Sequence, residues 1–575
     1  MLRHLTRFVL AAVLLFHSIA AFAFDVTLLH VNDSHSYLDA TSETIAPRGV
    51  AAYVRMGGWA RLGQAVKAVR AERPNVLLLH AGDAVQGGLY FLKFNGRPEM
   101  ELLDRLGFDA FELGNHEFDR GASFLAGMLA HTKVPVLCAN LHASDEPALA
   151  ARVKPYVIVE KGGERIGIIG LLTPEATVIS SPGDVEFADE THMAILLARE
   201  LQARGVNKIV LLTHVGFNED RRLAATVPGV DVIVGGHSHT LLGSPDGVGA
   251  LGLHPAAAYP TVVKGADGGD VYVVTAWKWG RMLGRLDLTF DDAGHITHAE
   301  ARPTLILGDT FKHRNDAGLK VELKGAERDD LLALVAADPE AAVVPADPAI
   351  RKFLGPFSQG VEAMRTEVIG EAVLPLPHIR VPGTTDTGES LPRGSLIAPL
   401  VCRAMLSRLE ATGRPADIAL LNAGGVRESV EQGPITVGAA YTLLPFNNSL
   451  VLLELTGAQI HRALEVGVDR GGGAFPYVGA ARYTADMRRP EGARVLAVDI
   501  LDHAGNWVPL APDRTYRVVT NNYLASGGDG YDVLKSAASR CDTGFVDAQA
   551  FIRYVERQRM LKPLPISGVT YIPAR

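Results

Sequence analysis

The sequence of 575 residues has little cysteine and no long tract rich in lysine and arginine. Its three cysteines, Cys138, Cys402 and Cys541, are too few for a disulfide framework, and no two are spaced as CxxC. One bridge, such as Cys402 to Cys541, is compatible with this count but not indicated by it. The formal net charge of −8 argues against a protein that grips the backbone of nucleic acid. A small anion held in a local positive pocket is still compatible with this composition.

Long apolar runs are also missing, except for a short one at the N-terminus. Arg3 and Arg7 precede the apolar stretch Phe8–Leu15, and Ala21-Phe22-Ala23 has the small-x-small pattern of a cleavage site. An uncleaved membrane anchor is the alternative, but the run is short for a spanning helix. We therefore predict a signal peptide over residues 1–23 and no stable membrane span. The mature protein would be exported, periplasmic or extracellular.

The composition is that of a soluble globular protein, with 47% hydrophobic and 21% charged residues. From Asp25 to about Phe290, apolar strand-like runs alternate with helical stretches, which is typical of a layered α/β domain. Two segments have helical spacing, Gly58–Arg70 and Met193–Arg204, and Thr261–Phe290 is expected to form antiparallel strands that close the domain. The predicted buried strands are Val26–His30, Val76–His80, Asp109–Leu113, Lys208–Thr213 and Asp231–Val234.

The second half of the chain has a different character. Residues 318–349 are rich in Ala, Asp and Glu, and Pro348–Glu367 is predicted to form one connecting helix. Val368–Ile572 then carries a second mixture of helices and strands with its own glycine-rich turns. We predict a first domain over residues 24–335, a connector region over 336–367 and a C-terminal domain over 368–575.

Ligand-type side chains follow each of the five predicted strands. In an open α/β sheet, ligands bind beyond the carboxyl ends of the strands, so these loops are expected to meet at one place. Each motif alone has a plain structural explanation, such as a Gly-Asp turn, but their arrival in order at five strand ends favours a site. Other histidines, including His30, His80, His131, His142 and His254, lack such neighbours and are interpreted as structural. The ligand-type residues at these five strand ends are Asp33 and His35, Asp83, those of the run Asn115–Asp119, His214, and His237 and His239.

The chemistry of this set predicts a pair of divalent ions. Imidazole, carboxylate and amide donors without cysteine suit zinc, manganese or a similar ion. The pairs Asp33/His35 and His237/His239 would each present two donors on the same side of an extended segment. Six or seven donors exceed the needs of one tetrahedral ion, which predicts two ions bridged by Asp83. Paired ions suit phosphoryl transfer.

These residues resemble the calcineurin-like metallophosphoesterases, and within them the periplasmic and surface 5′-nucleotidases that include UDP-sugar hydrolase. The resemblance covers nearly the whole mature chain. It implies a four-layer α/β/β/α metallophosphoesterase domain, a connector helix and a mixed α/β C-terminal nucleotide-binding domain. The motifs that carry it in the first half are Asp33-Ser34-His35, Gly82-Asp83, Gly114-Asn115-His116-Glu117-Phe118-Asp119, Thr213-His214 and Gly235-Gly236-His237-Ser238-His239.

The resemblance also implies a role for each of these residues. His116 and Asp119 would form a catalytic dyad, in which the imidazolium stabilises charge near phosphorus and the carboxylate orients it. The nucleophile would be a water molecule made acidic by the ions. One ion would be held by Asp33, His35, Asp83 and His239, and the other by Asp83, Asn115, His214 and His237.

Three segments of the second half resemble the C-terminal domain of the same family: Asn422–Arg427, Leu444–Asn448 and Asn521–Tyr531. The family implies that a nucleotide base is stacked between two aromatic rings, here Phe446 and Tyr523. Arg380 and Arg393 are candidates for a further arginine that contacts phosphate. The expected substrate-binding residues are Asn422, Gly424, Arg427, Phe446, Tyr523 and Asp529.

The function predicted from the sequence is release of phosphate from nucleotides by an exported 5′-nucleotidase, with a small-molecule partner rather than a nucleic acid polymer. A 2′,3′-cyclic-nucleotide phosphodiesterase, or a pyrophosphatase acting on UDP-sugars or NAD, would use the same metal site. The base-stacking segments argue against a thiosulfohydrolase. The complete ligand set and dyad argue against a nucleotide-binding protein without turnover.

Overall fold

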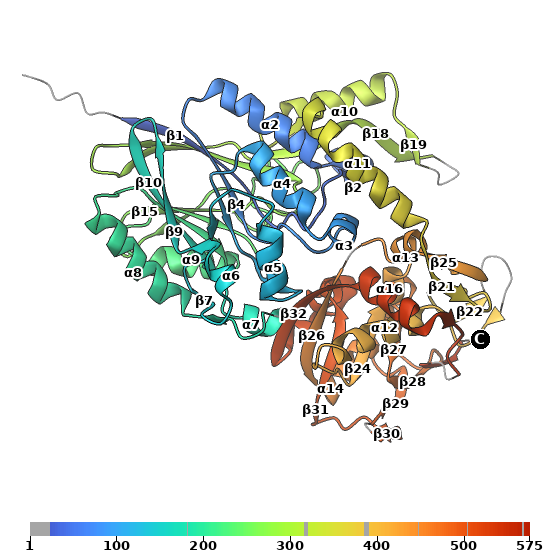
Figure 1. The fold of residues 1–575 in the computed structure, drawn as a ribbon. Helices are drawn as coiled ribbons and strands as arrows, with labels where there is room; N and C mark the ends of the chain where they lie inside the picture. Colours follow the sequence, from blue (N-terminus) through green and yellow to red (C-terminus); the bar gives the residue numbers. More distant parts are fainter. Residues whose placement is uncertain are drawn as a thin grey trace, which may run out of the picture. The chain divides into compact units, whose positions relative to one another are not determined.

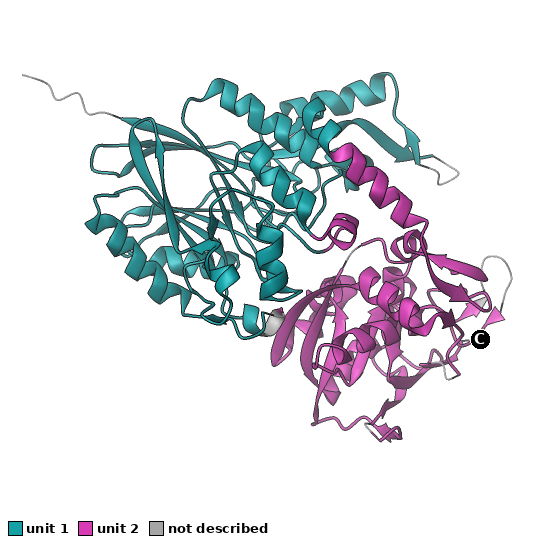
Figure 2. Ribbon diagram, in the orientation of Figure 1, with its two compact units in different colours: residues 1–86, 96–177, 182–353 teal, residues 87–95, 178–181, 354–575 magenta. Residues whose placement is uncertain are grey.

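A computed structural model describes residues 23–180, 182–315, 320–384, 390–446, 448–502, 504–565 and 568–574. The chain divides into two compact units (Figure 2). The first contains residues 1–86, 96–177 and 182–353, and the second contains residues 87–95, 178–181 and 354–575. The predicted signal peptide lies outside the described residues except for its last position. The predicted domain boundaries stay predictions.

The first unit is built on two β-sheets, the larger of which has twelve strands (Figure 1). Its main path runs β2-β3-β18-β16-β1-β4-β5-β6-β8, and β1, β4 and β5 are parallel neighbours. The strands are β1 (Phe24–Val31), β2 (Thr41–Ile45), β3 (Ala52–Met56), β4 (Val76–Ala81), β5 (Ala110–Glu112), β6 (Val136–Leu137), β8 (Val153–Lys154), β16 (Met282–Phe290), β17 (Ile296–Ala301), β18 (Thr304–Arg314), β19 (Lys320–Glu322) and β20 (Ala341–Val343).

The second sheet has six strands in the order β14-β15-β13-β12-β10-β9. Its strands β12 and β13 are parallel to each other. They resemble β1, β4 and β5 of the larger sheet in this respect. Two short strands, β7 (Leu141–His142) and β11 (Glu186–Phe187), pair separately. The six strands are β9 (Tyr156–Lys161), β10 (Glu164–Leu172), β12 (Ile209–His214), β13 (Val232–Gly235), β14 (Thr261–Lys264) and β15 (Asp270–Val274).

The two sheets face each other across an apolar core and carry helices on their outer faces. Leu28 and Leu79 of the larger sheet share one buried cluster with Leu212 and Val234 of the smaller sheet. A helix on the larger sheet packs Trp59 against the ring of His80, and a second core lies beneath the helices of the smaller sheet. The predicted four-layer α/β/β/α architecture is confirmed. The helices are α2 (Trp59–Glu72), α4 (Arg97–Leu106), α5 (Ala122–Leu129), α6 (Pro147–Ala150), α8 (Glu190–Ala203), α9 (Phe217–Thr226) and α10 (Ala326–Ala337).

The five strands predicted to precede ligand loops are all present, and they are divided between the two sheets. Strands β1, β4 and β5 belong to the larger sheet, and β12 and β13 belong to the smaller one. The segment 261–290 is likewise divided, since β14 and β15 extend the smaller sheet while β16 pairs with β1. Apolar alternation shows which segments are buried strands, but it does not show which sheet each strand joins.

The second unit is centred on a five-stranded sheet with the order β27-β24-β31-β26-β32. Its strands are β24 (Ile418–Asn422), β26 (Ser449–Thr456), β27 (Pro476–Gly479), β31 (Thr515–Asn521) and β32 (Ser539–Val546). A four-stranded sheet follows, with β28 (Ala481–Asp486), β29 (Val495–Leu501), β30 (Trp507–Pro509) and β34 (Val569–Ile572). Smaller sheets use β21 (Val368–Ala372), β22 (Gly383–Thr384), β23 (Ser390–Leu391), β25 (Gly433–Thr436) and β33 (Met560–Leu561).

Helices pack around these sheets, and one of them is the helix predicted over 348–367, which runs as α11 (Pro348–Arg365). Within the second unit, the short helix α3 (Leu89–Phe94) meets α11 through a 2.6 Å hydrogen bond between the hydroxyls of Tyr90 and Ser358. Cys402 is a free cysteine, so the bridge that the composition allowed between it and Cys541 is not formed. Every helix among the described residues is too short or too polar to span a bilayer. The other helices are α7 (Ala176–Ile179), α12 (Ala398–Glu410), α13 (Val437–Leu443), α14 (Gly457–Arg470), α15 (Asn522–Ala525) and α16 (Asp547–Gln558).

Candidate active site

The predicted metal ligands lie in the first unit, at the ends of strands from both of its sheets. Asp33, His35, Asp83 and Asn115 come from loops after β1, β4 and β5 of the larger sheet. His214 ends β12 of the smaller sheet, and His237 and His239 follow β13. Because the sheets face each other, their parallel strands deliver these side chains to one cluster.

Left-handed backbone, rather than an extended segment, turns several of these side chains inward. The φ angles are 49° at Asp33, 47° at His35, 77° at His237 and 51° at His239. The expectation that each pair lies on one face of an extended segment is therefore wrong. Non-glycine residues with positive φ are uncommon and cost free energy, so their concentration here is typical of a functional site.

The cluster brings its donor atoms within a few ångströms of one another. The Nε2 atoms of His35 and His239 are 2.8 Å apart, and Asp33 Oδ1 lies 3.4 Å from His239 Nε2. His214 Nε2 lies 3.0 Å from Asp83 Oδ2. Three groups of donor atoms lie within 4.8 Å of one another: Asp33, His35 and His239; Asp83, His214 and His237; and His35, Asp83 and His116.

The arrangement fits divalent metal ions. His214 Nδ1 lies 2.8 Å from the carbonyl oxygen of Ala81, so it can donate there while Nε2 presents its lone pair to the cluster. Among the described residues, the buried Asn115 Oδ1 has no hydrogen-bond partner. Unpaired buried acceptors are costly unless something positive lies beside them. The nitrogen and oxygen donors suit a first-row divalent ion.

Burial and mutual charge shift the pKa values of these groups in opposite directions. Burial disfavours ionisation of Asp33, but His239 and His214 outweigh it and lower the pKa of Asp33 to about 2. Burial lowers the pKa of His35 to about 3. His214 is also buried, but Asp83 beside it raises the pKa of the imidazole to about 9. The cluster therefore combines an ionised carboxylate, Asp33, with several imidazole nitrogens.

The predicted dyad is assembled beside this cluster. His116 Nδ1 lies 2.9 Å from Asp119 Oδ2, and Gln86 Nε2 donates to the same oxygen at 2.7 Å. The backbone N–H of His116 donates to Asp83 Oδ1 at 3.0 Å. A ring nitrogen of His116 also lies within 4.8 Å of ligand atoms of His35 and Asp83. Its position is therefore compatible both with a metal ligand and with a general acid.

Glu117 holds two ligand loops together, a role that the sequence did not reveal. Its buried carboxylate accepts four backbone N–H groups, those of Asp83 at 3.0 Å, Ala84 at 2.8 Å, Val85 at 3.3 Å and Gly114 at 2.7 Å. The loop after β4 is thereby tied to the loop after β5. Glu117 stands inside the motif Gly114–Asp119, but nothing in its spacing distinguishes a ligand from a residue that positions ligands.

Asn32 similarly orients Asp33. Its amide nitrogen donates to Asp33 Oδ2 at 2.6 Å and to the carbonyl of Trp277 at 2.9 Å, while its oxygen accepts the N–H of Ala276 at 2.7 Å. The side chain thus fixes one carboxylate oxygen against the loop that precedes β16. Such partners of metal ligands control their orientation and affinity.

In the second unit, three predicted substrate-binding residues form a hydrogen-bonded group. Asn422 Nδ2 donates to Asp529 Oδ2 at 2.8 Å, and the Tyr523 hydroxyl donates to Asp529 Oδ1 at 2.8 Å. Asn521, which was not predicted, donates to Asn422 Oδ1 at 3.2 Å. The polar side chain at the end of β24, Asn422, thus contacts the segment that follows β31.

The other predicted substrate-binding residues lie around Arg427. Its guanidinium lies 5.6 Å from the centre of the Phe446 ring and donates to the carbonyl of Gly424 at 3.3 Å. Phe446 is 46% exposed and Tyr523 47% exposed, which is unusual for large rings. Two accessible rings suit stacking of a flat ligand.

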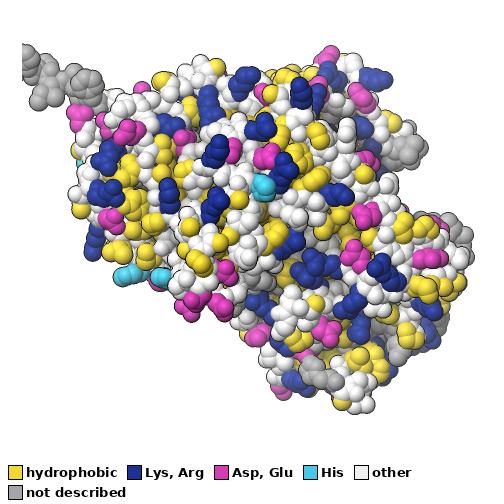
Figure 3. Space-filling model, viewed as in Figure 1, with side chains coloured by type: hydrophobic (Ala, Val, Ile, Leu, Met, Phe, Trp, Pro, Cys, Tyr) yellow, Lys and Arg dark blue, Asp and Glu magenta, His cyan; other side chains and the backbone are white. Residues whose placement is uncertain are grey.

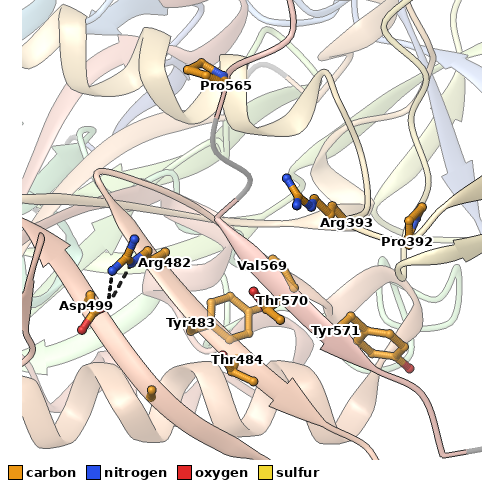
Figure 4. A pocket seen from close by; sticks show the side chains of 11 residues that line it. Pro392, Arg393, Arg482, Tyr483, Thr484, Asp499, Pro565, Val569, Thr570 and Tyr571 are labelled. Atoms are coloured by element: carbon orange, nitrogen blue, oxygen red, sulfur yellow. Dashed lines mark hydrogen bonds and ion pairs between the residues drawn. The ribbon is translucent and has the colours of Figure 1, made fainter.

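Arg393 lies elsewhere in this unit. It lines a hollow of about 580 Å³ with Arg482, Asp499 and Tyr571 (Figure 4). In that hollow Arg482 donates to Asp499 Oδ2 at 2.9 Å through Nε. None of the six predicted substrate-binding residues lines it, so the structure does not bring Arg393 together with them there.

Two families match the chain, one in each half. Calcineurin-like phosphoesterases match residues 26–241, and the 5′-nucleotidase C-terminal domain matches residues 378–536. A probable 5′-nucleotidase of Treponema pallidum is 37% identical over 95% of this chain and 94% of its own length. The chain belongs to the 5′-nucleotidase family.

Solved structures of 5′-nucleotidases have the same fold. The NAD nucleotidase of Haemophilus influenzae superposes with a TM-score of 0.82 at 31% identity, covering 96% of this chain and 99% of the other. A 5′-nucleotidase precursor from Thermus thermophilus has a TM-score of 0.58 at 39% identity, covering 96% and 99%. As a 5′-nucleotidase family member, this chain is a phosphoester hydrolase with a metallophosphoesterase domain, a fold that implies divalent metal.

Proposed function

We propose that the chain is an exported 5′-nucleotidase that uses two divalent ions to release phosphate from nucleotides. The observation that carries the proposal is that six of the seven predicted ligands, from two sheets, lie in one largely buried cluster; they are Asp33, His35, Asp83, His214, His237 and His239. Asp33, His35, Asp83 and His239 would hold one ion, and Asp83, Asn115, His214 and His237 the other. Zinc or manganese suits these donors.

The bound ions would supply Lewis-acid charge and acidify an attacking water molecule. His116 would act as the general acid: Asp119 accepts its Nδ1–H, which leaves Nε2 to give a proton to the leaving oxygen. Gln86 holds Asp119 in place by donating to the oxygen that His116 contacts. Glu117 and Asn32 keep the ligand loops in position.

Recognition of the nucleotide would fall to the second unit. Phe446 and Tyr523 would stack on the base, and the Asp529 carboxylate, held by Asn422 and Tyr523, would accept a ribose hydroxyl. Arg427 would contact sugar or phosphate, with Gly424 allowing close approach of the backbone. In this proposal, residues 24–335 form the metallophosphoesterase domain, residues 336–367 the connector and residues 368–575 the substrate-binding domain.

A second candidate substrate is a dinucleotide with a pyrophosphate link. The observation that favours it is the relative named NAD 5′-nucleotidase from Haemophilus influenzae, 32% identical over 96% of this chain and 93% of its own length. Water activated at the same cluster would attack the pyrophosphate of a dinucleotide or the phosphate ester of a mononucleotide. Substrate geometry, rather than the metal site, would distinguish the two reactions.

A substrate panel tests the proposal. Metal-reconstituted protein is incubated with AMP, NAD, UDP-glucose and 2′,3′-cyclic AMP, and phosphate and nucleosides are quantified. We expect phosphate and adenosine from AMP, and none from the Asp83→Ala variant, which should also bind less metal. Turnover of all four substrates by metal-stripped protein, or of none by loaded protein, would overturn the proposal. Export is tested separately, by determining the N-terminal residue of the mature protein.

A further inference from the structure

We propose that a second anion site, built for a phosphate-bearing ligand, lies between helices α12 and α16 of the second unit. The two helices pack side by side around a hollow of about 400 Å³. Arg408, Arg553 and Arg557 line it, with Ser407, Tyr554 and Glu556. We call this hollow the arginine groove. None of the predicted metal ligands or nucleotide-binding residues lines it.

The groove gathers positive charge on a chain whose net charge is negative. Arg403 lies one turn before Ser407 on α12. Its positive charge and that of Arg557 both lower the pKa of the Tyr554 hydroxyl, although burial raises that pKa more. The lining residues include three arginines and one acid, Glu556. Figure 3 shows dark-blue side chains gathered over α12 and α16. Such a concentration attracts small anions.

Two arginines elsewhere in the same unit are held by ion pairs. Arg488 and Asp486 form a two-pronged pair at 2.8 Å, and Arg494 lies 3.2 Å from Asp469. Within the part of the chain that the structure describes, no carboxylate forms an ion pair with Arg403, Arg553 or Arg557. Neighbouring guanidinium groups repel one another, and a bound anion would relieve that repulsion.

Neutral contacts hold two of the guanidinium groups in place. Arg557 Nη2 donates to the Ser407 hydroxyl across the groove, which joins α16 to α12. The Arg408 guanidinium lies 3.8 Å from the centre of the Phe545 ring. These contacts reduce the entropy lost on binding while leaving other N–H donors for a ligand. The planar fork of arginine matches phosphate oxygens, so the ligand class is a phosphate or phosphate ester dianion.

Phosphate titration of the metal-loaded protein tests the site. By isothermal titration calorimetry, we expect two phosphate sites on the wild type, one at the metal cluster and one in the groove. Arg553→Gln/Arg557→Gln should keep only the first, with groove affinity reduced at least tenfold, and Asp83→Ala should keep only the second. The control Arg462→Gln/Arg489→Gln removes two exposed arginines of the same unit outside the groove and should keep both.

The source of the phosphate is distinguished by a vesicle arm. Co-sedimentation with phosphatidylcholine vesicles, with and without phosphatidic acid, whose headgroup is a phosphate monoester, separates a lipid headgroup from a free phosphate. Phosphate binding without vesicle binding indicates a soluble ligand, and loss of vesicle binding in Arg553→Gln/Arg557→Gln indicates a headgroup. One phosphate site on the wild type without vesicle binding, or equal losses in the groove and control variants, would overturn the proposal. Thermal melts check that both double variants fold.

Discussion

At the scale of single residues, the site separates side chains that would hold metal from those that would act on substrate. His116 is the critical case because its ring lies close to the predicted ligands His35 and Asp83 and also contacts Asp119 of the dyad. His116→Ala should keep the bound metal and reduce turnover of AMP by roughly a hundredfold or more, as expected for loss of one acid or charge-stabilising group. Metal content by mass spectrometry and kcat are measured together. A fall in metal stoichiometry would instead make His116 a ligand.

Glu117 makes a second prediction, because its carboxylate accepts four backbone N–H groups from the two ligand loops. In Glu117→Gln, the amide nitrogen would face N–H donors, so the loops should separate. Affinity for the divalent ion should fall by about 10- to 100-fold, the usual cost of losing such a partner. Chelator competition measures it.

Glu112 supplies the matched control. It is also buried in the first unit, and burial raises the pKa of its carboxyl well above the ordinary value, so an amide changes its charge little. Glu112→Gln should leave metal affinity unchanged. Equal losses in the two variants would mean that Glu117 only supports folding.

At the scale of elements, helix α16 begins at a buried acid that makes stability depend on pH. Asp547 is 2% exposed, and burial raises the pKa of its carboxyl to about 7. Its Oδ1 accepts the Ala548 N–H at 2.7 Å. In the unfolded chain the carboxyl ionises near its ordinary pKa of 3.8, so the folded state binds the proton more tightly and is favoured at low pH.

The stabilisation from Asp547 is therefore lost progressively as pH rises from the ordinary pKa of 3.8, and its loss is complete above the folded-state pKa of about 7. Asp547→Asn keeps an oxygen acceptor but cannot ionise, so its unfolding midpoint in urea should rise relative to the wild type between pH 5 and pH 8. Each pKa unit corresponds to about 1.4 kcal/mol. The difference in unfolding midpoint between the wild type and Asp547→Asn reports the titration of Asp547, because all other titratable groups are the same in the two proteins. Parallel pH profiles would contradict the assignment.

At the scale of the whole molecule, the metal cluster and the proposed base-binding residues belong to different units. Replacing both Phe446 and Tyr523 with Ala should weaken binding of AMP and spare hydrolysis of p-nitrophenyl phosphate, which has no base. Loss of about 1–3 kcal/mol of stacking per ring should raise KM for AMP by roughly five- to a hundredfold per ring. Unchanged kinetic constants for AMP would remove the base-stacking assignment.

The individual residues of the candidate site could be read from the sequence because metal chemistry restricts residue type. Asp, His and Asn after five apolar runs indicate donors at strand ends, and each run forms a strand. The same reading missed Glu117, Asn32 and Gln86. Their roles depend on backbone groups and side chains distant in the sequence, and a buried carboxylate or amide has no spacing pattern of its own.

The sequence by itself determined the α/β layering, the donor types and the two-part organisation, because apolar periodicity and residue chemistry are local properties. Only the tertiary structure decided that the ligand loops come from two facing sheets and that left-handed backbone turns Asp33, His35, His237 and His239 inward. It alone brought the arginines of α12 and α16 around one groove. The reason is physical: which sheets face each other, and which loops then bend, follows from burial of apolar surface between segments far apart in the chain.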